Sequence, residues 1–537
     1  MQEIKNPDRP KVSLGNKIAF ACGDVFGGGS FNIINFLFVP FLTLTVGIPM
    51  YWVGVIMLVS KIWDGIIDPF IGNISDAKQP KKYGKRRFFM LICAPLLIVA
   101  MVLLFFPWSL VTNSVALKVV LTILVYLIYA TTQSFILIPY YSLGSEMSAD
   151  FVERTNVNAV RLGFSIFSSV ICVAVPGMIA GPEKGPLSYI VMAAIFGGVF
   201  CIAVLVTALF AREQIVSPAV KNKVNFKRFF EPLKMSTYRN YLGMQMCSSM
   251  GMAIMSSYFF TYCDFWLREG TYMNSLVNGA ARFPVATVAA AIMFAAQIVA
   301  LPLYFAIIKN KGKSFAYRTG AGIWAAIALV LFFLPQQQFD PATFQVTKQA
   351  PDWLLFVLAF AIGIGIGGPV LVPHTAFGDV CDAGELYYGA RREGAFSGLS
   401  NFLNTTAQAL GLAVASWVIG AAGYLETTYT APTKHAEYYF EKIYEGIGKS
   451  TWVPTSQPDS ANLAIRIVIA FLPILIMALG VFFSFKYKLT RERQNRIAAC
   501  VKLDKHSEEY AKTRQQLLQE LDEKVVELEF DGQQDKN

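Results

Sequence analysis

Two aspartates, Asp64 and Asp68, stand four residues apart in the apolar sequence KIWDGIIDP at residues 61–69. That spacing places both carboxylates on one face of a helix, and each charge near the centre of a membrane helix costs on the order of 3 kcal/mol. We therefore expect the pair to face a cavity, where two carboxylates offer oxygen ligands to a small cation or share a proton. The alternative is a structural pair that Lys61 or Arg161 neutralises.

Two further charged residues, Asp24 and Arg161, lie in or at the edge of other apolar segments. A carboxylate accepts hydrogen bonds from hydroxyl groups, so Asp24 is a candidate for substrate binding; alternatively, it joins two helices beside the small glycines at 27–29. Arg161 could hold a pair of hydroxyls or a carboxylate. It could equally pair with Glu146 or with one of the two aspartates at 64 and 68.

Aromatic residues accompany these charged groups, and a lining of aromatic faces suits the ring of a polyol substrate. For any one of them, packing in the core or at a membrane interface is the alternative. His374 either lines the same cavity or packs against its neighbours. Because the chain has 3 histidines, far apart in sequence, we expect neither a metal site nor a histidine-based triad. The aromatic candidates are Trp63, Tyr140, Tyr141, Tyr258 and Tyr262.

The elements that must position these side chains are long apolar segments. Hydrophobic residues make up 55% of the 537-residue chain and charged residues 15%, against about 25% charged in soluble domains. A membrane helix needs about 20 apolar residues, and open sheets cannot span lipid, so we predict an all-α membrane protein of roughly twelve spans. The predicted spans are 18–46, 50–75, 88–108, 117–146, 158–181, 188–211, 238–267, 283–308, 318–335, 353–378, 393–423 and 462–487.

The basic residues predict how these spans are oriented. Lysine and arginine gather in every second loop, at 78–87, 212–234 and 309–318, which predicts that these loops and both termini are cytoplasmic. The same distribution accounts for the net charge of +10 without nucleic acid as a partner.

Basic clusters recur six segments apart and predict two similar six-helix halves in parallel arrangement. The expected organisation is an N-terminus at 1–17, bundles at 18–211 and 238–488, a cytoplasmic linker at 212–237, an external loop at 424–461 and a cytoplasmic tail at 489–537. Within the tail, apolar residues at near-helical spacing predict an amphipathic helix; they are Leu517, Leu518, Leu521, Val525, Val526 and Leu528.

Several motifs resemble those of the glycoside–pentoside–hexuronide:cation symporters, the branch of the major facilitator superfamily that includes melibiose permease. They occur in the expected order between about residues 15 and 490. The matching stretches are KIWD through DP at 61–69, YGK at 83–85 with Arg87, IPYYSL at 138–143, Glu153-Arg154 leading to Arg161, GDVCDAGE at 378–385, and Arg391 with Glu393 before AFS at 395–397.

This resemblance implies a multi-pass transporter of the cell (inner) membrane that works as a monomer without a bound cofactor and couples a small sugar-like substrate to Na⁺ or H⁺. By analogy Asp64 and Asp68 bind the cation beside the hydroxyl of Ser134. Asp24, Arg161 and Tyr141 hold the sugar, with Tyr140, Trp63 and His374 as further lining. The resemblance also implies that acids in a loop pair with arginines to close the cytoplasmic side: Asp379, Asp382, Glu385, Arg154 and Arg391.

The chain departs from melibiose-type carriers at three positions. It has Leu137 in place of a sugar-binding aspartate, Ile67 in place of an asparagine between the paired acids, and Asn404 in place of a lysine. The sugar and the coupling ion therefore stay open, and Ser134 keeps an oxygen ligand that suits Na⁺. A lipid-like substrate and a transporter-like sensor that signals through the tail are alternatives. An embedded enzyme is disfavoured because the sequence has no recognisable catalytic cluster.

Overall fold

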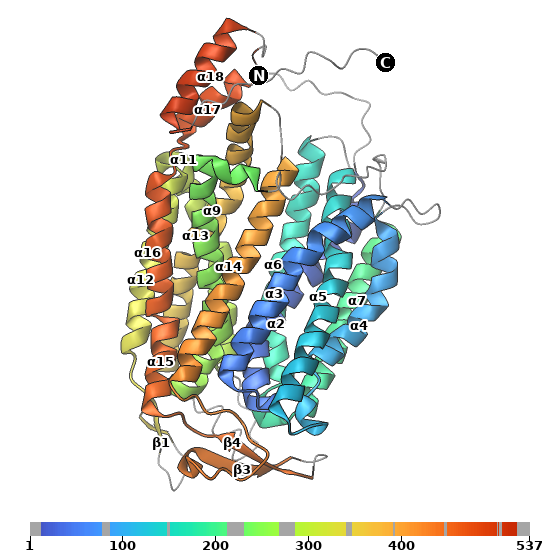
Figure 1. The fold of residues 1–537 in the computed structure, drawn as a ribbon, viewed down its shortest axis with the longest axis vertical. Helices are drawn as coiled ribbons and strands as arrows, with labels where there is room; N and C mark the ends of the chain where they lie inside the picture. The colour runs from blue at the N-terminus through green and yellow to red at the C-terminus, as the bar shows by residue number, and fades with distance from the viewer. Residues whose placement is uncertain are drawn as a thin grey trace.

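The computed structural model describes residues 12–77, 86–147, 151–211, 230–267, 285–339, 346–348, 350–389, 393–444, 448–501, 503 and 507–523. Long helices run side by side through the whole length of the molecule (Figure 1). Among the described residues, 11 helical segments are long and apolar enough to cross a membrane. This confirms the predicted class, an all-α membrane protein.

The N-terminal half contains the helices drawn from blue to blue-green in Figure 1. Its helices follow the six predicted segments, with ends that differ by a few residues. They are α1 (Leu14–Cys22), α2 (Asp24–Pro40), the π-helix η1 (Phe41–Val46), α3 (Met50–Ala77), α4 (Arg87–Leu104), α5 (Val115–Glu146), α6 (Phe151–Ile179) and α7 (Leu187–Phe210), with short 3-10 turns η2 (Trp108–Leu110) and η3 (Pro182–Lys184).

The C-terminal half begins with the short turn η4 (Glu231–Lys234). Its long helices are α9 (Ser236–Tyr262) with the π-helix η5 (Cys263–Leu267), α11 (Val285–Lys311), α12 (Lys313–Phe333), α13 (Asp352–Tyr388), α14 (Glu393–Ala421), α15 (Asp459–Ile469) and α16 (Phe471–Lys486). α9 is rich in Ser, Tyr and Met and is less apolar than the other spans, yet 19 of its 27 residues are buried. It is therefore the twelfth span, enclosed by protein and not by lipid.

One helix end differs from the sequence-based expectation. The tenth span was expected to end at 378, with the acids Asp379, Asp382 and Glu385 in a loop, but α13 continues to Tyr388. The helix ends where Gly389 takes a left-handed conformation with φ 73°. The three acids therefore lie on the last turns of a helix.

The first span is interrupted at Gly23, where α1 ends and α2 begins. A Cβ at Gly23 would lie 2.5 Å from Cε2 of Tyr140, so only glycine permits this approach to α5. The interruption puts Asp24 at the start of α2, inside the bundle.

Three pairs of helices join the two halves: α3 with α14, α2 with α9, and α6 with α11. α3 packs on α14 at Gly65, where a Cβ would lie 2.6 Å from a ring carbon of Phe402. Because α3 carries Asp64 and Asp68, both acids lie beside the contact between the halves.

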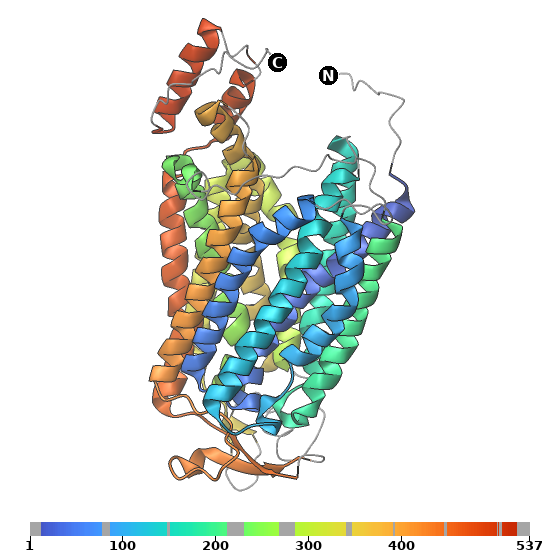
Figure 2. The ribbon, with the colours of Figure 1, turned by 45° about the vertical axis from the view of Figure 1, so that its right-hand side comes forward.

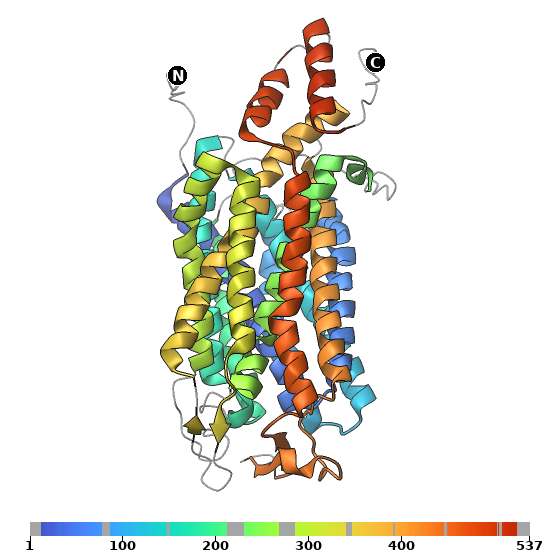
Figure 3. The same cartoon turned by 90° about the vertical axis from the view of Figure 1, so that its left-hand side faces the viewer.

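The two ends of the bundle carry different additions (Figures 2 and 3). At one end, here the hairpin end, β3 (Tyr439–Ile443) pairs antiparallel with β4 (Ser450–Pro454) after the turn η6 (Ala436–Tyr438), and β1 (Gln338–Phe339) pairs with β2 (Val346–Lys348). At the other, here the tail end, α17 (Arg491–Cys500) and α18 (Glu508–Glu520) extend beyond the spans.

The tail thus contains two short helices, where the sequence predicted one. Leu517, Leu518 and Leu521 are buried as the amphipathic pattern predicted. The tail rests on the C-terminal half, because Arg514 Nε donates 2.8 Å to the carbonyl of Leu386 at the end of α13. Glu523 accepts hydrogen bonds from backbone amides at the start of α9. The other predicted tail positions, 525, 526 and 528, and the linker residues 212–229 lie outside the described residues.

Candidate functional site

Asp68 lies where three helices meet. Its Oδ1 accepts a 2.6 Å hydrogen bond from Ser134 Oγ of α5, and its Oδ2 accepts a 3.4 Å hydrogen bond from Asn401 Nδ2 of α14. Ser134 was expected here from the family resemblance, whereas Asn401 was not. The carboxylate therefore contacts both halves of the protein, and carboxylate and hydroxyl oxygens such as those of Asp68 and Ser134 are ligands that a small hard cation prefers.

Asp64 sits one helical turn before Asp68 and has a cationic neighbour. Lys61 Nζ lies 3.8 Å from Asp64 Oδ2, and the side chains are 10% and 19% exposed, respectively. The same ammonium group lies 5.2 Å from the centre of the Phe31 ring. Lys61 thus partly fulfils the neutralising role considered from the sequence. One positive and two negative charges leave the cluster with a net negative charge, which suits a bound cation or proton.

Asp24, Arg161 and Tyr141 form a second polar group, in the N-terminal half. Asp24 is buried, lies within electrostatic range of Arg161 and accepts a hydrogen bond from Ser165. A Cβ at Gly27 would lie 2.6 Å from Asp24 Oδ1 and 3.4 Å from the hydroxyl of Tyr141. Because Gly27 has no side chain, the space beside Asp24 Oδ1 and the Tyr141 hydroxyl stays open.

Arg161 is the incompletely bonded member of this group. The centre of its guanidinium lies 5.4 Å from the Tyr141 ring, while its buried Nε has no hydrogen-bond partner within the described structure. Leaving such a donor unpaired costs about 1–3 kcal/mol or more. The Tyr141 side chain is 48% exposed to the space beside it. A hydroxyl or carboxylate of a ligand would satisfy the guanidinium at this place.

Other predicted lining residues have roles in packing or lie apart. Tyr140 is buried, stacks on Phe20 at 4.7 Å and donates a 3.0 Å hydrogen bond to the Phe20 carbonyl. Trp63 Nε1 donates to Thr131 Oγ1 at 3.0 Å, joining α3 to α5. His374 is an exposed residue of α13 in the other half. The predicted aromatics Tyr258 and Tyr262 are buried and donate to backbone carbonyls of α14 and α12.

The predicted cytoplasmic charge network is described only in part. Asp379 pairs with Lys313 at the start of α12 and accepts a hydrogen bond from Gln494 of α17. The side chains of Arg154 and Arg391 lie outside the described residues. Among the described residues, Asp379 therefore pairs within the C-terminal half and tail, a pairing that the sequence did not predict.

The hairpin end is closed by a segment that crosses from the C-terminal to the N-terminal half. Within this crossing segment (residues 424–458), the Thr427 hydroxyl donates to the Leu44 carbonyl at 2.7 Å and the Tyr429 hydroxyl to the Thr45 carbonyl at 2.6 Å. Both acceptors belong to η1, whose π-helical geometry leaves end carbonyls free. Burial raises the pKa of the neighbouring Glu426 carboxyl.

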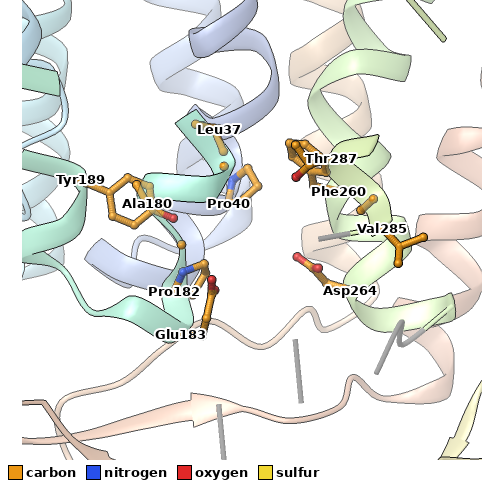
Figure 4. A pocket seen from close by; sticks show the side chains of 13 residues that line it. Leu37, Pro40, Ala180, Pro182, Glu183, Tyr189, Phe260, Asp264, Val285 and Thr287 are labelled. Carbon is orange, nitrogen blue, oxygen red and sulfur yellow. The ribbon is translucent and has the colours of Figure 1, made fainter. Parts of the chain in front are cut away.

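A pocket of about 90 Å³ lies behind this closure, between the two halves (Figure 4). Glu183 of η3 and Asp264 of η5 point into it from opposite halves. The pocket does not include Asp64 or Asp68, so the cavity and the cation candidate are different places in the fold. No feature of the local sequence marked Glu183 and Asp264 as a pair, because they lie on separate spans.

Comparisons with known proteins agree with this architecture. Residues 19–491 match the family model described as MFS/sugar transport protein. The chain is 26% identical to an uncharacterized symporter, YjmB, of Bacillus subtilis. That alignment covers 91% of this chain and 95% of the relative. The chain is 20% identical to the sodium-dependent lysophosphatidylcholine symporter 1-B of Danio rerio. That alignment covers 91% of this chain and 90% of the relative. The fold is similar to that of the crystal structure of the nucleoside transporter NupG, with a TM-score of 0.54 and 14% sequence identity. The superposition covers 88% of this chain and 99% of the NupG chain.

Proposed function

The chain belongs to the MFS/sugar transport protein family, and from this membership and the geometry above we propose that it carries a sugar, glycoside or hexuronide together with Na⁺ or H⁺. It is a multi-pass membrane transporter of the major facilitator type and not an enzyme. One observation carries the coupled part of the proposal. The carboxylate of Asp68 contacts Ser134 of one half and Asn401 of the other.

A cation at this place would act on the contact between the halves. Asp64, Asp68 and the Ser134 hydroxyl supply oxygens directly, and the amide of Asn401 can turn its oxygen toward a bound ion. A ligand shifts a conformational equilibrium only as far as it binds one state more tightly than another. A site that both halves complete meets that condition, because moving α14 away from α3 removes one of its groups.

The substrate would occupy the neighbouring space beside Asp24, Arg161 and Tyr141. The carboxylate accepts hydrogen bonds from hydroxyls, the unpaired guanidinium donates to hydroxyls or a carboxylate, and the exposed Tyr141 ring offers an apolar face. A sugar or uronate presents all three kinds of group. Leu137, whose methyl carbon lies near Gly27, makes one wall of this space apolar.

We propose that the tail end is cytoplasmic and that the structure is closed toward the outside. Lys309, Lys311 and Lys313 lie at the tail end. Short loops rich in lysine and arginine favour the cytoplasmic side of a membrane. The crossing segment ties the two halves together only at the hairpin end. Alternating access then requires this closure to open while the tail end closes.

Uptake into proteoliposomes tests the proposal. A panel of sugars, glycosides and hexuronides is offered to the purified protein under separate inward gradients of Na⁺ and H⁺. We expect one cation gradient to drive accumulation of a panel member, and Asp64→Asn and Asp68→Asn to abolish it. Glu441→Gln, at an exposed acid of β3, is the matched control. Unchanged accumulation in both aspartate variants would contradict the assignment.

A lysophospholipid is a second candidate substrate, favoured by the similarity to the sodium-dependent lysophosphatidylcholine symporter of Danio rerio. Such a substrate has a charged headgroup that the Asp24–Arg161 group could bind and a long apolar chain. The same proteoliposome assay separates the two candidates. Uptake of lysophosphatidylcholine that no sugar inhibits would replace the sugar proposal, and sugar uptake that lysophosphatidylcholine leaves unchanged would support it.

A further inference from the structure

A cleft of about 320 Å³ opens at the tail end of the C-terminal half, away from the two candidate binding groups. Its walls come from three parts of the chain that are distant in sequence. They are the turn between α11 and α12, Asp379 of α13, and the beginning of α17 in the tail. Neither the aspartate pair nor the Asp24–Arg161 group contributes to this cleft, so the proposed transport function leaves it unexplained.

The cleft is strongly basic. Lys309, Lys313 and Arg491 line it, against the single carboxylate of Asp379. That carboxylate is already bound by Lys313 and Gln494. Lys309 forms no ion pair with any described residue, and Arg491 Nη1 makes a long 3.3 Å hydrogen bond to the Lys309 carbonyl. Two cationic groups therefore face the cleft without an anionic partner in the described structure.

The surroundings of the cleft are apolar on the side toward the membrane. Phe305 lines the cleft and is 52% exposed, and Leu303 and Val299, two and six residues earlier on α11, are exposed as well. At the end of α11, Lys311 Nζ lies 4.7 Å from the centre of the Phe315 ring of α12, a cation–π contact between a basic and an apolar side chain. The cleft thus lies where apolar helix surface meets basic side chains.

We propose that this cleft binds the phosphate group of an anionic phospholipid. Basic pockets between membrane helices suit such headgroups, and the acyl chains would lie along the exposed face of α11 that ends at Phe305. The backbone amides at the start of α12 add to the attraction, because its preceding residue, Gly312, provides no side-chain cap. A free phosphate or an acidic peptide would use the basic residues and leave the apolar face uncovered.

Binding would connect the lipid to the tail and to the charge network. The phosphate would contact Lys309 of α11 and Arg491 of α17 together, and so hold α17 against the spans. It would also compete with Asp379 for Lys313, a contact that joins α12 to α13. The composition of the surrounding membrane would thereby influence the tail-end contacts of the C-terminal half.

Binding of short-chain lipids to the full-length protein in a neutral detergent tests this inference. We expect dioctanoyl phosphatidylglycerol to be retained in native mass spectra and to raise the thermal unfolding midpoint, whereas dioctanoyl phosphatidylcholine does neither. A variant with Lys309→Gln and Arg491→Gln should bind phosphatidylglycerol at least roughly tenfold more weakly, because each basic residue near an anionic lipid surface contributes on the order of one tenfold step.

A charge-matched control distinguishes the cleft from general attraction. Arg318→Gln with Lys486→Gln removes two positive charges at the same end, from side chains that lie over the rings of Phe485 and Phe482 outside the cleft. This control should bind phosphatidylglycerol as the parent does. Equal weakening in both variants, equal retention of phosphatidylcholine, or an equal thermal shift with inorganic phosphate at the same concentration would each overturn the proposal.

Discussion

Each half of the protein contains an arginine within the bundle, and the two are bonded very differently. Arg466 of α15 donates hydrogen bonds from Nε and Nη2 to the Phe332 carbonyl, at 3.1 and 2.5 Å. Its guanidinium also lies 4.1 Å from the Trp266 ring. Within the described structure, Arg161 of α6 has a single ring contact, with Tyr141, at the longer distance of 5.4 Å. Its buried Nε lacks a hydrogen-bond partner among the described residues.

We infer from this difference that Arg466 has a structural role, whereas a substrate-binding role is proposed for Arg161. A charged group inside the fold is tolerated more readily when it forms hydrogen bonds, as the half-buried Arg466 does with the Phe332 carbonyl. In the proposed function, a ligand would complete the bonding of the Arg161 guanidinium. The N-terminal half also contains Asp24, Asp64 and Asp68, so the residues proposed to bind the cation and the substrate lie mainly in that half, and the C-terminal half contributes neutral groups such as Asn401.

The largest expected effect of a substitution within this comparison is at Arg161. Arg161→Gln removes the charge that would bind substrate, and we expect uptake of the identified substrate to fall by roughly a hundredfold, since an unpaired charged contact in a binding site costs about 2–5 kcal/mol. The thermal unfolding midpoint should stay within about a degree of the parent, because few contacts are lost. Initial uptake rates and a thermal scan measure the two. A large loss of stability with normal uptake would contradict the functional role.

The reverse result is expected at Arg466. Arg466→Gln should lower the thermal unfolding midpoint by several degrees, because it removes two charged hydrogen bonds worth about 1.5–3 kcal/mol each. Below that midpoint, the KM for substrate should be unchanged, since the side chain contacts α12 and η5 and lies outside the substrate group. Arg466→Lys should recover only part of the loss, because a lysine cannot stack on Trp266 in the same way. A raised KM would show that the two arginines do not differ in kind.

The two ends of the bundle also differ. The crossing segment joins both halves at the hairpin end, whereas the tail contacts only the C-terminal half among the described residues. Tyr429→Phe with Thr427→Val removes two hydrogen bonds to η1, each worth about 1 kcal/mol. We expect roughly a tenfold or greater rise in labelling of a cysteine placed in the closed region behind η1. Tyr438→Phe, in the same segment but without a hydrogen bond from its hydroxyl to η1, is the control. Equal labelling of all three proteins would show that the segment does not hold this end closed.

Much of the fold was predictable because lipid imposes a local rule on sequence. A run of apolar residues is a span wherever it occurs, so the segments at 50–75 and 188–211 correspond to α3 and α7 within a few residues. The boundary of α13 was missed because a membrane rule does not describe a helix that continues into water, where the cap at Gly389 decides the end. The short break at Gly23 depends on the ring of Tyr140, far away in sequence.

The candidate site was predictable only where its members share one helix. Asp64 and Asp68 could be placed together from their spacing, and Ser134 from the family resemblance. Asn401 could not be placed, since its contact with Asp68 depends on how α14 packs on α3. The pairing of Asp379 with Lys313 and Gln494 likewise joins three distant segments, and only tertiary packing brings them together.

The smallest effect is expected at the ion pair between Lys17 of α1 and Glu153 of α6, whose charged atoms lie 2.8 Å apart. The hydrogen bond from Lys17 lowers the pKa of the Glu153 carboxyl below its ordinary value of 4.5. A carboxyl with a lowered pKa stabilises the fold above its ordinary pKa, and the contribution disappears as the pH falls through the lowered value. Glu153→Gln should therefore lower the unfolding midpoint at pH 7 by about one degree, as expected for the loss of a single ion pair. At pH 3 the difference between variant and parent should shrink. A difference that stays constant from pH 7 to pH 3 would mean that packing of the side chain, and not its charge, joins α1 to α6.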